Sequence, residues 1–360
     1  MSLSIVVGGQ YGSEGKGKVA AIIATRQDVD IAVRCGGPNS GHSFVTENGA
    51  EYLVRQVPTA FINRRTRLLI PAGATVDLDV LRRETELLGI APERLGVDVE
   101  AMIIDECDKN TERILRLGDR ISSTLCGVGS AIARRVLRGA DVTLAKDAAA
   151  SNPWLANVLA SVSEEVNEAL DRGKRVLVEG TQGFGLSLFH SGHYPKTTSK
   201  DTSASAFLSE VGVSPRFASE IVLVMRTFPI RVAGAQAGPL NDEITWDQLQ
   251  AECQSPTSIL EYTSVTKKVR RLGRFDWNLA CRAVRVNRPT SIAINCIDHL
   301  TFADHGVKTF NRLSQKSRDF VSELERRLRV PVRLIGTGPS LADTFERISD
   351  PGLAAKKVAS

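Results

Sequence analysis

Residues 3–7 (LSIVV) run directly into the glycine-rich stretch GGQYGSEGKGK at Gly8–Lys18, and VAAII follows at Val19–Ile23. This order predicts a buried strand, a tight turn and a helix. Glycines in such a turn let backbone N–H groups approach an anion, and the N-terminus of the helix adds a partial positive charge. Together with the two lysines of the turn, these features predict a phosphate-binding loop.

Of two known patterns for such loops, one fits this stretch in part and the other does not fit. The Walker pattern G-x-x-x-x-G-K-[ST] matches from Gly12 to Lys18, but Val19 stands where the magnesium-binding hydroxyl belongs. The Rossmann pattern G-x-G-x-x-G does not match. A second glycine-rich loop, RCGGPNSGHS at 34–43, follows the next predicted strand. Loops at the carboxyl ends of parallel strands line one crevice, so His42 is expected to face the phosphate loop, although a structural role for it stays open.

Outside these loops, short β-branched runs alternate with longer helical runs. Asn152 and Pro153 predict the start of a helix that ends at Gly173. The alternation predicts an α/β fold with a large, mostly parallel central sheet, helices on both faces and inserted loops, notably at 228–263. We expect residues 1–360 to form a single domain. The other predicted strands are Ile31–Arg34, Leu68–Ile70, Met102–Asp105, Val176–Glu179, Ile221–Arg226, Ile292–Ile297 and Val332–Ile335, and the other predicted helices are Asp79–Leu88 and Ser314–Leu328.

The composition limits the classes of function. The chain has 360 residues, with 46 Lys plus Arg against 41 Asp plus Glu, so its net charge is +5. This small excess suits anionic small molecules better than nucleic acid, and residues 267–274 hold five positive charges and no negative one. No apolar run reaches the roughly 18 residues that a membrane span needs. The six cysteines form no Cys-x-x-Cys pair and the N-terminus has no signal-peptide pattern, so we expect reduced thiols and a cytoplasmic protein.

Six motifs in order along the chain resemble those of the adenylosuccinate synthetase family. The phosphate loop resembles the family's G-Q-W-G-D-E-G-K-G-K, and NSGH at Asn39–His42 resembles its N-A-G-H. The other four are VEGTQG at 178–183, YPKTTS at 194–199, VTKKVRRLG at 265–273 and GTGP at 336–339. The length is similar to that of compact archaeal and phage members. The resemblance implies the family's fold, which is related to that of P-loop nucleotide hydrolases.

The resemblance implies a carbon–nitrogen ligase that joins L-aspartate to C6 of a purine nucleotide. In the family, a nucleoside triphosphate first phosphorylates the purine O6, and the amine of aspartate then displaces the phosphate. Lys16 is then expected to hold the γ-phosphate, and His42 to be a general acid near the transferred phosphoryl group. Mg²⁺ is the implied cofactor, with Ser13 and Gly41 as its ligands. Ser13, Lys16, His42 and Gln182 form the predicted catalytic set.

The resemblance also assigns the binding residues. Arg134 matches an arginine that the family supplies from a second subunit, which implies a homodimer, and Arg135 is a competing assignment. Asp298 matches the aspartate that reads the base of the donor nucleotide. The predicted triphosphate contacts are Gly12, Glu14, Gly15, Lys16, Gly17, Lys18, Gly41, His42, Ser43, Asp298, Gly336, Thr337 and Gly338; those of the nucleotide substrate are Ser13, Asn39, Ser123, Thr124, Arg134, Gln182, Thr198 and Val232; those of aspartate are Val265, Thr266, Lys268 and Arg270.

Ser13 is the largest departure from the family pattern. The family has aspartate there, as the base that takes the N1 proton of the purine and as a Mg²⁺ ligand, and a serine hydroxyl is poor at both tasks. Loss of the carboxylate also opens space beside purine N1 and C2, where guanine carries an amino group that can donate to a hydroxyl. The substitution resembles the phage enzymes that convert dGMP into N6-succino-2-amino-2′-deoxyadenylate for 2-aminoadenine DNA. A phage origin would place the protein in the host cytoplasm.

Two further departures bear on the substrates. Lys268 replaces an arginine that reaches the substrate ribose and aspartate, and lysine lacks the planar fork of arginine; a deoxyribose would need one contact fewer. Cys296 stands where longer members have a lysine that helps to read guanine, so ATP or dATP is expected as the donor, with GTP as the alternative. We therefore predict a ligase acting on dGMP, L-aspartate and ATP or dATP. The alternatives are an ordinary adenylosuccinate synthetase acting on IMP with GTP, and a nucleotide-binding regulator that has lost catalysis.

Overall fold

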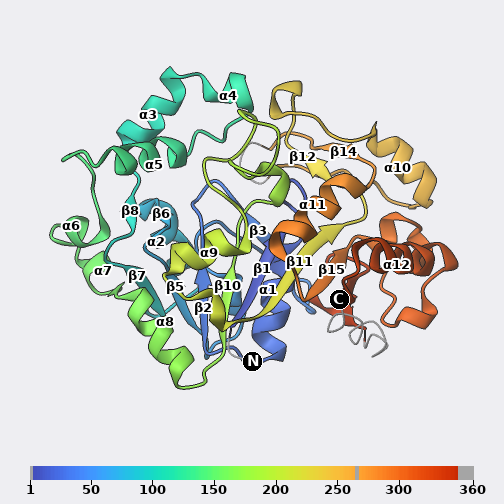
Figure 1. Cartoon of the computed structure of the whole chain (residues 1–360), viewed down its shortest axis with the longest axis horizontal. Helices are drawn as coiled ribbons and strands as arrows, with labels where there is room; N and C mark the ends of the chain where they lie inside the picture. The colour runs from blue at the N-terminus through green and yellow to red at the C-terminus, as the bar shows by residue number, and fades with distance from the viewer. Residues whose placement is uncertain (1–2, 264–266, 348–360) are drawn as a thin grey trace.

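In the computed structural model, which describes residues 3–263 and 267–347, a ten-stranded sheet runs through the middle of the molecule (Figure 1). Strand β1 (Leu3–Gly8) lies inside this sheet, between β10 (Val176–Glu179) and β11 (Ala218–Arg226). Every neighbouring pair is parallel except β16 (Val332–Gly336) with β17 (Thr344–Glu346) at one edge. The predicted α/β class with a mostly parallel sheet is confirmed. The strand order is β17-β16-β15-β11-β1-β10-β2-β5-β7-β9, and the remaining members are β2 (Ile31–Arg34), β5 (Arg67–Ile70), β7 (Leu95–Asp98), β9 (Leu159–Ala160) and β15 (Ser291–Asn295).

Alternating side chains on the central strands build an apolar core on each face of the sheet. On β1, Leu3, Ile5 and Val7 belong to one buried cluster and Val6 to the other. Successive strand residues point to opposite faces, so a strand covered on both faces must be apolar nearly throughout. The first cluster includes residues of α8, α9, α11 and α12, and the second includes residues of α1 and α2. The longer helices are α1 (Lys16–Arg26), α2 (Leu78–Leu87), α3 (Glu106–Ile114), α5 (Val128–Leu137), α8 (Val162–Asp171), α9 (Ala204–Val211), α10 (Trp246–Cys253), α11 (Trp277–Asn287) and α12 (Gln315–Leu328).

The predicted turn between β1 and α1 is present and depends on glycine. Gly15, the residue before α1, has a φ of 90°, which lies in the left-handed region that favours glycine. A Cβ at this position would also lie 2.7 Å from Nδ2 of Asn295. Because glycine has no side chain to cap the helix, the first N–H groups of α1 are left for another acceptor.

The single helix predicted at 153–173 is wrong. The structure divides it into α7 (Pro153–Ala156), β9 and α8. The backbone N–H of Val97 in β7 donates to the carbonyl of Val158, and β9 pairs with β7 at the edge of the central sheet. Pairing with the sheet therefore takes precedence over the helical spacing of the apolar residues.

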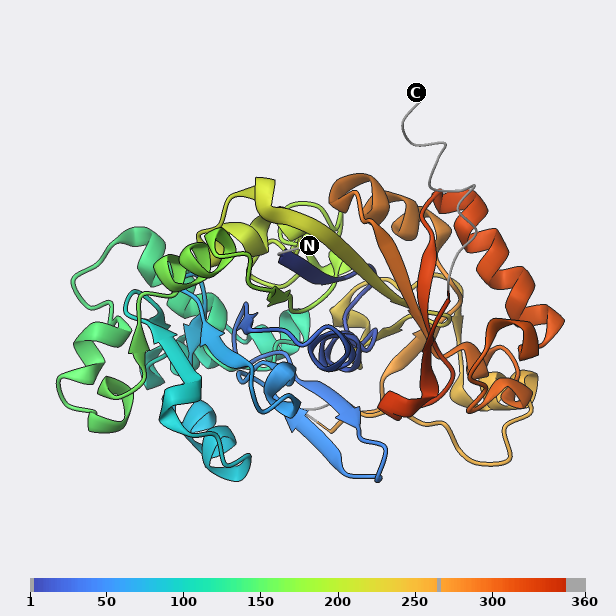
Figure 2. The ribbon, with the colours of Figure 1, turned by 90° about the horizontal axis from the view of Figure 1, so that it is seen from below.

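The inserted segments form smaller sheets rather than plain loops. The region predicted as loops contributes β12 (Ile230–Arg231) and β13 (Glu243–Ile244), which both pair with β14 (Arg271–Gly273). The strand predicted at Met102–Asp105 is reduced to β8 (Met102–Ile103), because it pairs with the two-residue β6 (Thr75–Val76) outside the central sheet. Figure 2 shows α1 end-on, with the hairpin of β3 (His42–Val45) and β4 (Glu51–Val54) projecting beside it. None of the helices in the described ranges is long and apolar enough to cross a membrane.

Candidate active site

Two cavities open beside the phosphate loop. The first, of about 500 Å³, is lined by this loop, by the second glycine-rich loop and by residues of the segment 118–125. The second, of about 750 Å³, is lined by Lys18, by the β3–β4 hairpin (42–54) and by residues of the segment 295–305. Ser13 is exposed and lines both cavities, so the residue that departs from the family pattern stands at their junction.

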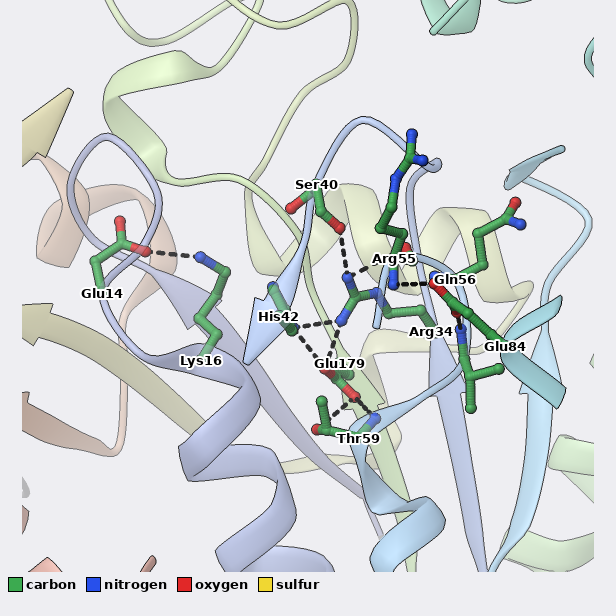
Figure 3. Close-up of polar contacts among 11 residues, drawn as sticks. Glu14, Lys16, Arg34, Ser40, His42, Arg55, Gln56, Thr59, Glu84 and Glu179 are labelled. Atoms are coloured by element: carbon green, nitrogen blue, oxygen red, sulfur yellow. Dashed lines mark hydrogen bonds and ion pairs between the residues drawn. The ribbon is translucent and has the colours of Figure 1, made fainter. Parts of the chain in front are cut away.

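Glu14 and Lys16 form a buried ion pair inside the phosphate loop (Figure 3). Lys16 Nζ lies 2.7 Å from Oε2 of Glu14, and the carboxyl side chain has no exposed surface. The other carboxylate oxygen accepts the backbone N–H groups of Gln10 at 3.0 Å and Gly12 at 2.9 Å. The loop is therefore folded around its own carboxylate, which also holds the Lys16 ammonium at the wall of the first cavity.

His42 is the first residue of β3 (His42–Val45), and Glu179 at the end of β10 orients its ring (Figure 3). Its Nδ1 lies 2.5 Å from Oε1 of Glu179 and also contacts the Arg34 guanidinium. Arg34 donates to the same carboxylate at 2.6 Å, and Thr59 donates to it through its N–H and its hydroxyl. His42 Nε2 is buried and has no hydrogen-bond partner among the described residues, and the residue lines the first cavity.

The charges around His42 set its protonation state. Burial, together with the positive charge of Arg34, lowers the pKa of His42 from 6.5 to about 3. Burial would raise the pKa of Glu179, but the charge of Arg34 and the hydrogen bond from His42 lower it below its usual value. His42 is therefore a neutral imidazole beside a carboxylate. An anion in the cavity favours the charged imidazole, so a general-acid proton would arrive together with a phosphate.

The second cavity is lined by a cation, Lys18, and a carboxylate, Asp298. Lys18 Nζ donates to the carbonyl of Gly338 at 2.9 Å, and burial lowers the pKa of this ammonium. A Cβ at Gly336 would lie 2.8 Å from the same Nζ, so this glycine makes room for the lysine. Asp298 is almost buried and lies 2.9 Å from Nδ1 of His305. The cavity thus offers an ammonium for phosphate oxygens and a carboxylate for the edge of a base.

The two cavities gather most of the predicted site residues. Val265 and Thr266, predicted to bind aspartate, lie outside the described residues. The roles of the gathered residues stay predictions, although their proximity fits them. The first cavity is lined by the predicted residues Gly12, Ser13, Gly15, Lys16, Gly17, Asn39, Gly41, His42, Ser43, Ser123, Thr124, Gln182, Val232, Lys268 and Arg270. The second is lined by Ser13, Glu14, Gly15, Lys18, Ser43, Asp298 and Gly338.

Four predicted contacts among the described residues, Thr198, Gly336, Thr337 and Arg134, line neither of these two cavities. Thr198 lines a smaller hollow together with Asn39 and Gln182, so it adjoins the first cavity through these two residues. Thr337 is fully buried, and its hydroxyl contacts the carbonyls of Val307 and Asp343 at 2.9 and 3.0 Å. Its hydroxyl therefore supports the chain behind Gly338 in this structure.

Arg134 is occupied within its own chain. Its guanidinium donates to Asp105 and, through two nitrogens, to Asp108, whose side chain is 1% exposed. Hydrogen bonding to Asp108 raises the pKa of Arg134 above its usual value, against the effect of burial. Arg135 donates to the carbonyl of Ala72 at 2.9 Å. Neither arginine lines the two cavities of the single chain, and their role in a second subunit's site, like the homodimer, stays a prediction.

Four charged residues of the site were not among those predicted from the sequence. Glu179 lies inside a recognised motif, and Arg34 and Arg226 end buried strands, so a charge at the carboxyl end of an apolar run was an available signal. Glu261, which pairs with Arg226 and lines both cavities, carries no such signal because it precedes no regular element. Its place in the site depends on a contact with a residue far away in the sequence, which no local pattern indicates.

The donor atoms near Ser13 and Gly41 fit a metal ion held mainly by its substrate. Both residues line the first cavity, but they supply only a hydroxyl and a carbonyl. The carboxylate of Glu14 is already bonded to Lys16 and to two backbone N–H groups. Mg²⁺ often keeps several waters and binds one or two carboxylates plus substrate phosphates. The predicted Mg²⁺ would therefore depend on phosphate oxygens more than on this chain.

The parallel sheet, the phosphate loop and the paired cavities define the class as an α/β nucleotide-binding enzyme. The sequence model of adenylosuccinate synthetase matches residues 5–144 and 140–305. The chain belongs to the adenylosuccinate synthetase family, and it is a carbon–nitrogen ligase of that type. The family expectation from the sequence is confirmed.

Named relatives agree with this assignment. The adenylosuccinate synthetase of Thermococcus sibiricus is 43% identical over 94% of this chain and 96% of its own length. That of Methanocaldococcus jannaschii is 41% identical over 96% of this chain and 97% of its own length. These archaeal proteins extend over nearly the whole chain, so the family match is not confined to one motif.

Two solved structures share the fold. The fully ligated adenylosuccinate synthetase of Plasmodium falciparum has a TM-score of 0.86 at 18% identity and covers 96% of this chain and 99% of its own, which shows the fold alone. The succinoaminodeoxyadenylate synthetase of cyanophage S-2L, bound to dGMP and to dATP as an energy donor, has a TM-score of 0.82 at 26% identity. It covers 99% of both chains.

Proposed function

We propose that this ligase joins L-aspartate to C6 of dGMP, with ATP or dATP as the phosphoryl donor, and forms N6-succino-2-amino-2′-deoxyadenylate. The observation that carries the proposal is Ser13, an exposed hydroxyl at the junction of the two cavities, where the family has a carboxylate. The cyanophage structure supports it, because that protein has the same fold and holds dGMP and dATP.

A contact with Arg226 holds the backbone of Ser13. The residue has a φ of 57°, in the left-handed region, and its carbonyl accepts a hydrogen bond from the buried Arg226 at 3.2 Å. A serine side chain is shorter than aspartate and uncharged, so it leaves space beside the purine ring. Its oxygen can accept a hydrogen bond from the 2-amino group of guanine, which hypoxanthine lacks.

The remaining residues act by position and charge. Lys16 exchanges its contact with Glu14 for the γ-phosphate, and the N–H groups at the start of α1 stabilise the charge of the transferred group. His42, oriented by Glu179, presents Nε2 to the phosphoryl group and donates the proton that arrives with the anion. Lys268 and Arg270 supply cations for the aspartate carboxylates. Bound Mg²⁺ would neutralise charge on the phosphates.

A second candidate is an ordinary adenylosuccinate synthetase acting on IMP with GTP. The names of the archaeal relatives favour it, because they are 39–43% identical to this chain over nearly its full length. The two candidates share the fold, the phosphate loop and the chemistry, and differ in the purine and the donor. The donor is tested separately, since Cys296 and Asp298 both line the second cavity.

One assay separates these candidates. Purified protein receives Mg²⁺, L-aspartate and one donor (ATP, dATP or GTP), with dGMP, GMP or IMP in parallel, and phosphate release and product mass are recorded. We expect the highest kcat/KM with dGMP and with ATP or dATP. Turnover with IMP alone would refute the dGMP proposal in favour of the second candidate. Nucleotide binding without turnover of any purine would favour a regulator.

A further inference from the structure

The serine at position 13 leaves the purine N1 proton without the family's acceptor. Phosphorylation of O6 requires that this proton be taken up, and a serine hydroxyl is a poor base at its usual pKa. A carboxylate elsewhere in the site would supply the missing group. Among the described residues, the carboxylates that line the two cavities are Glu14, Glu51, Asp119, Glu261 and Asp298.

Four of these carboxylates are poorly placed for the junction where Ser13 stands. Glu14 is enclosed, and its oxygens are bonded inside the phosphate loop. Asp119 lines only the first cavity, and its side chain is 70% exposed and paired with Arg116. Glu51 and Asp298 line only the second cavity. Glu261 alone among the five lines both cavities, as Ser13 does.

Arg226 ties Glu261 to Ser13 directly. One guanidinium nitrogen, NH1, lies 3.1 Å from Oε2 of Glu261 and 3.2 Å from the carbonyl oxygen of Ser13. The other, NH2, lies 2.5 Å from Oε1 of Glu261. The Glu261 carboxylate and the Ser13 carbonyl therefore accept hydrogen bonds from the same nitrogen of Arg226.

The Arg226 support is rigid and the carboxylate is accessible. Gln10 exchanges two hydrogen bonds of 3.0 Å with the backbone of Arg226, which fixes the end of β11 beside the phosphate loop. The Arg226 side chain is 2% exposed, whereas that of Glu261 is 34% exposed. The arginine is thus a buried support, and the carboxylate it holds faces the cavities.

We propose that Glu261 is the catalytic base that accepts the N1 proton of the purine nucleotide in place of the family's aspartate. The proposal rests on the proposed ligase function. As O6 bonds to the γ-phosphorus, the C6=O6 π pair moves onto O6, the N1–H electron pair forms the N1=C6 double bond, and the proton passes to Glu261. The bond between the γ-phosphorus and the bridging oxygen breaks, and the nucleoside diphosphate leaves.

The electrostatics are compatible with this task. Burial would raise the pKa of Glu261, but the charge of Arg226 and its hydrogen bonds lower it below the usual value. The carboxylate is therefore ionised at neutral pH, which is the form that can accept a proton. A third of the side chain is exposed, which gives the proton a path to solvent after phosphate has left.

The test compares Glu261→Gln with a matched control, Glu243→Gln. Glu243 forms a similar two-point pair with Arg271, at 2.8 and 2.6 Å, but lines neither cavity. Phosphoryl transfer is followed without aspartate, through exchange of ¹⁸O between the bridging and non-bridging positions of the donor's β-phosphate in the presence of dGMP. We expect Glu261→Gln to lose on the order of 100-fold or more in this exchange, with an unchanged dissociation constant for dGMP, and Glu243→Gln to stay within about twofold.

A rescue variant separates a base from a structural support. Ser13→Asp returns a carboxylate to the junction, so Ser13→Asp in the Glu261→Gln background should regain at least about tenfold in exchange. The rescue is measured with IMP beside dGMP, because IMP has no 2-amino group for the new carboxylate to oppose. Exchange within about threefold of wild type for Glu261→Gln alone would overturn the proposal, as would a large loss that Ser13→Asp fails to rescue. A wild-type protein that turns over no purine would instead refute the proposed function, and that result is visible before any variant is made.

Discussion

The phosphate loop (Gly8–Lys18) and residues 267–274 are both rich in cations, but they hold them in opposite ways. In the phosphate loop, the partner of Lys16 is Glu14, two residues away and buried. In the second segment, Arg271 and Arg274 pair with glutamates of other elements, at contacts of 2.6 Å. The first arrangement is local in the sequence, and the second exists only after folding.

This difference changes how the five positive charges at 267–274 are interpreted. Counted along the sequence, five cations without an anion indicated a device for anionic substrates. In the structure, Arg271 and Arg274 are paired with Glu243 and Glu252, and only some of the cations face a cavity. A local charge excess therefore overstates the charge that a substrate meets.

The largest expected effect comes from the locally paired lysine. Lys16→Ala removes the cation that we propose binds the transferred γ-phosphate, and we expect kcat to fall by about 10³-fold or more because such charges act mainly on the transition state. Steady-state phosphate release with dGMP measures this. Lys174→Ala, an exposed lysine outside both cavities, serves as the control. Activity near wild type for Lys16→Ala would show that the loop is not the phosphate site.

His42→Ala tests the proposed general acid, and we expect a loss of about 10²–10³-fold in kcat. Stability gives an independent readout. Because folding lowers the pKa of His42 to about 3, the unfolded state binds the proton first as the pH falls below 6.5. This group alone then removes about 1.4 kcal/mol of stability per pH unit between pH 6 and pH 4.

The His42→Ala variant should lose that part of the pH dependence. Urea unfolding of both proteins from pH 7 to pH 4 measures it, with the difference in unfolding free energy narrowing toward acid. Parallel curves would show that His42 is not held neutral in the folded protein.

Ser13→Asp restores the family residue at the junction of the cavities. Aspartate tolerates the left-handed conformation that Ser13 adopts, so we expect the variant to fold. Its ratio of kcat/KM for dGMP over IMP should fall by about tenfold, as expected when one buried polar contact is changed. An unchanged ratio would remove Ser13 as the selector of the purine.

The smallest expected effects compare two arginines of the same segment. Arg270→Ala removes a cation that lines the first cavity, and we expect the KM for aspartate to rise about tenfold, in line with a lost charge-assisted hydrogen bond. Arg274→Ala removes an exposed pair with Glu252, and we expect less than a twofold change. Equal effects would mean that the charge of the segment acts as a whole and not residue by residue.

Much of the fold could be predicted because its signals are local. The run Leu3–Val7 and the glycines after it gave the central strand and the turn, and a helix matching α2 was expected within one residue at each end. The helix predicted at 153–173 failed because apolar residues at 155, 158 and 159 suit a helix and a strand equally. Pairing with β7, a strand far away in the sequence, decides for the strand.

In the site too, residues in local motifs could be predicted, and residues placed by long-range contacts could not. Recognised motifs placed Lys16, Asn39 and His42 beside one cavity, since each belongs to a loop at the end of a predicted strand. They did not indicate that Arg134 would be bonded to its own chain's Asp108, because that contact depends on how α3 packs on α5. Nor did they indicate Glu261, whose place at the junction depends on Arg226, 35 residues earlier.

The shared wall between the cavities has a thermodynamic consequence. Ser13, Gly15 and Ser43 line both cavities, so a ligand in either one contacts groups that the other ligand also meets. Any change in affinity that the donor imposes on the purine nucleotide must be returned by the purine nucleotide to the donor in equal measure. Binding of the two nucleotides is therefore thermodynamically linked. Their cooperativity is positive if the first nucleotide leaves Ser13, Gly15 and Ser43 in the position that the second nucleotide requires, and negative if it does not.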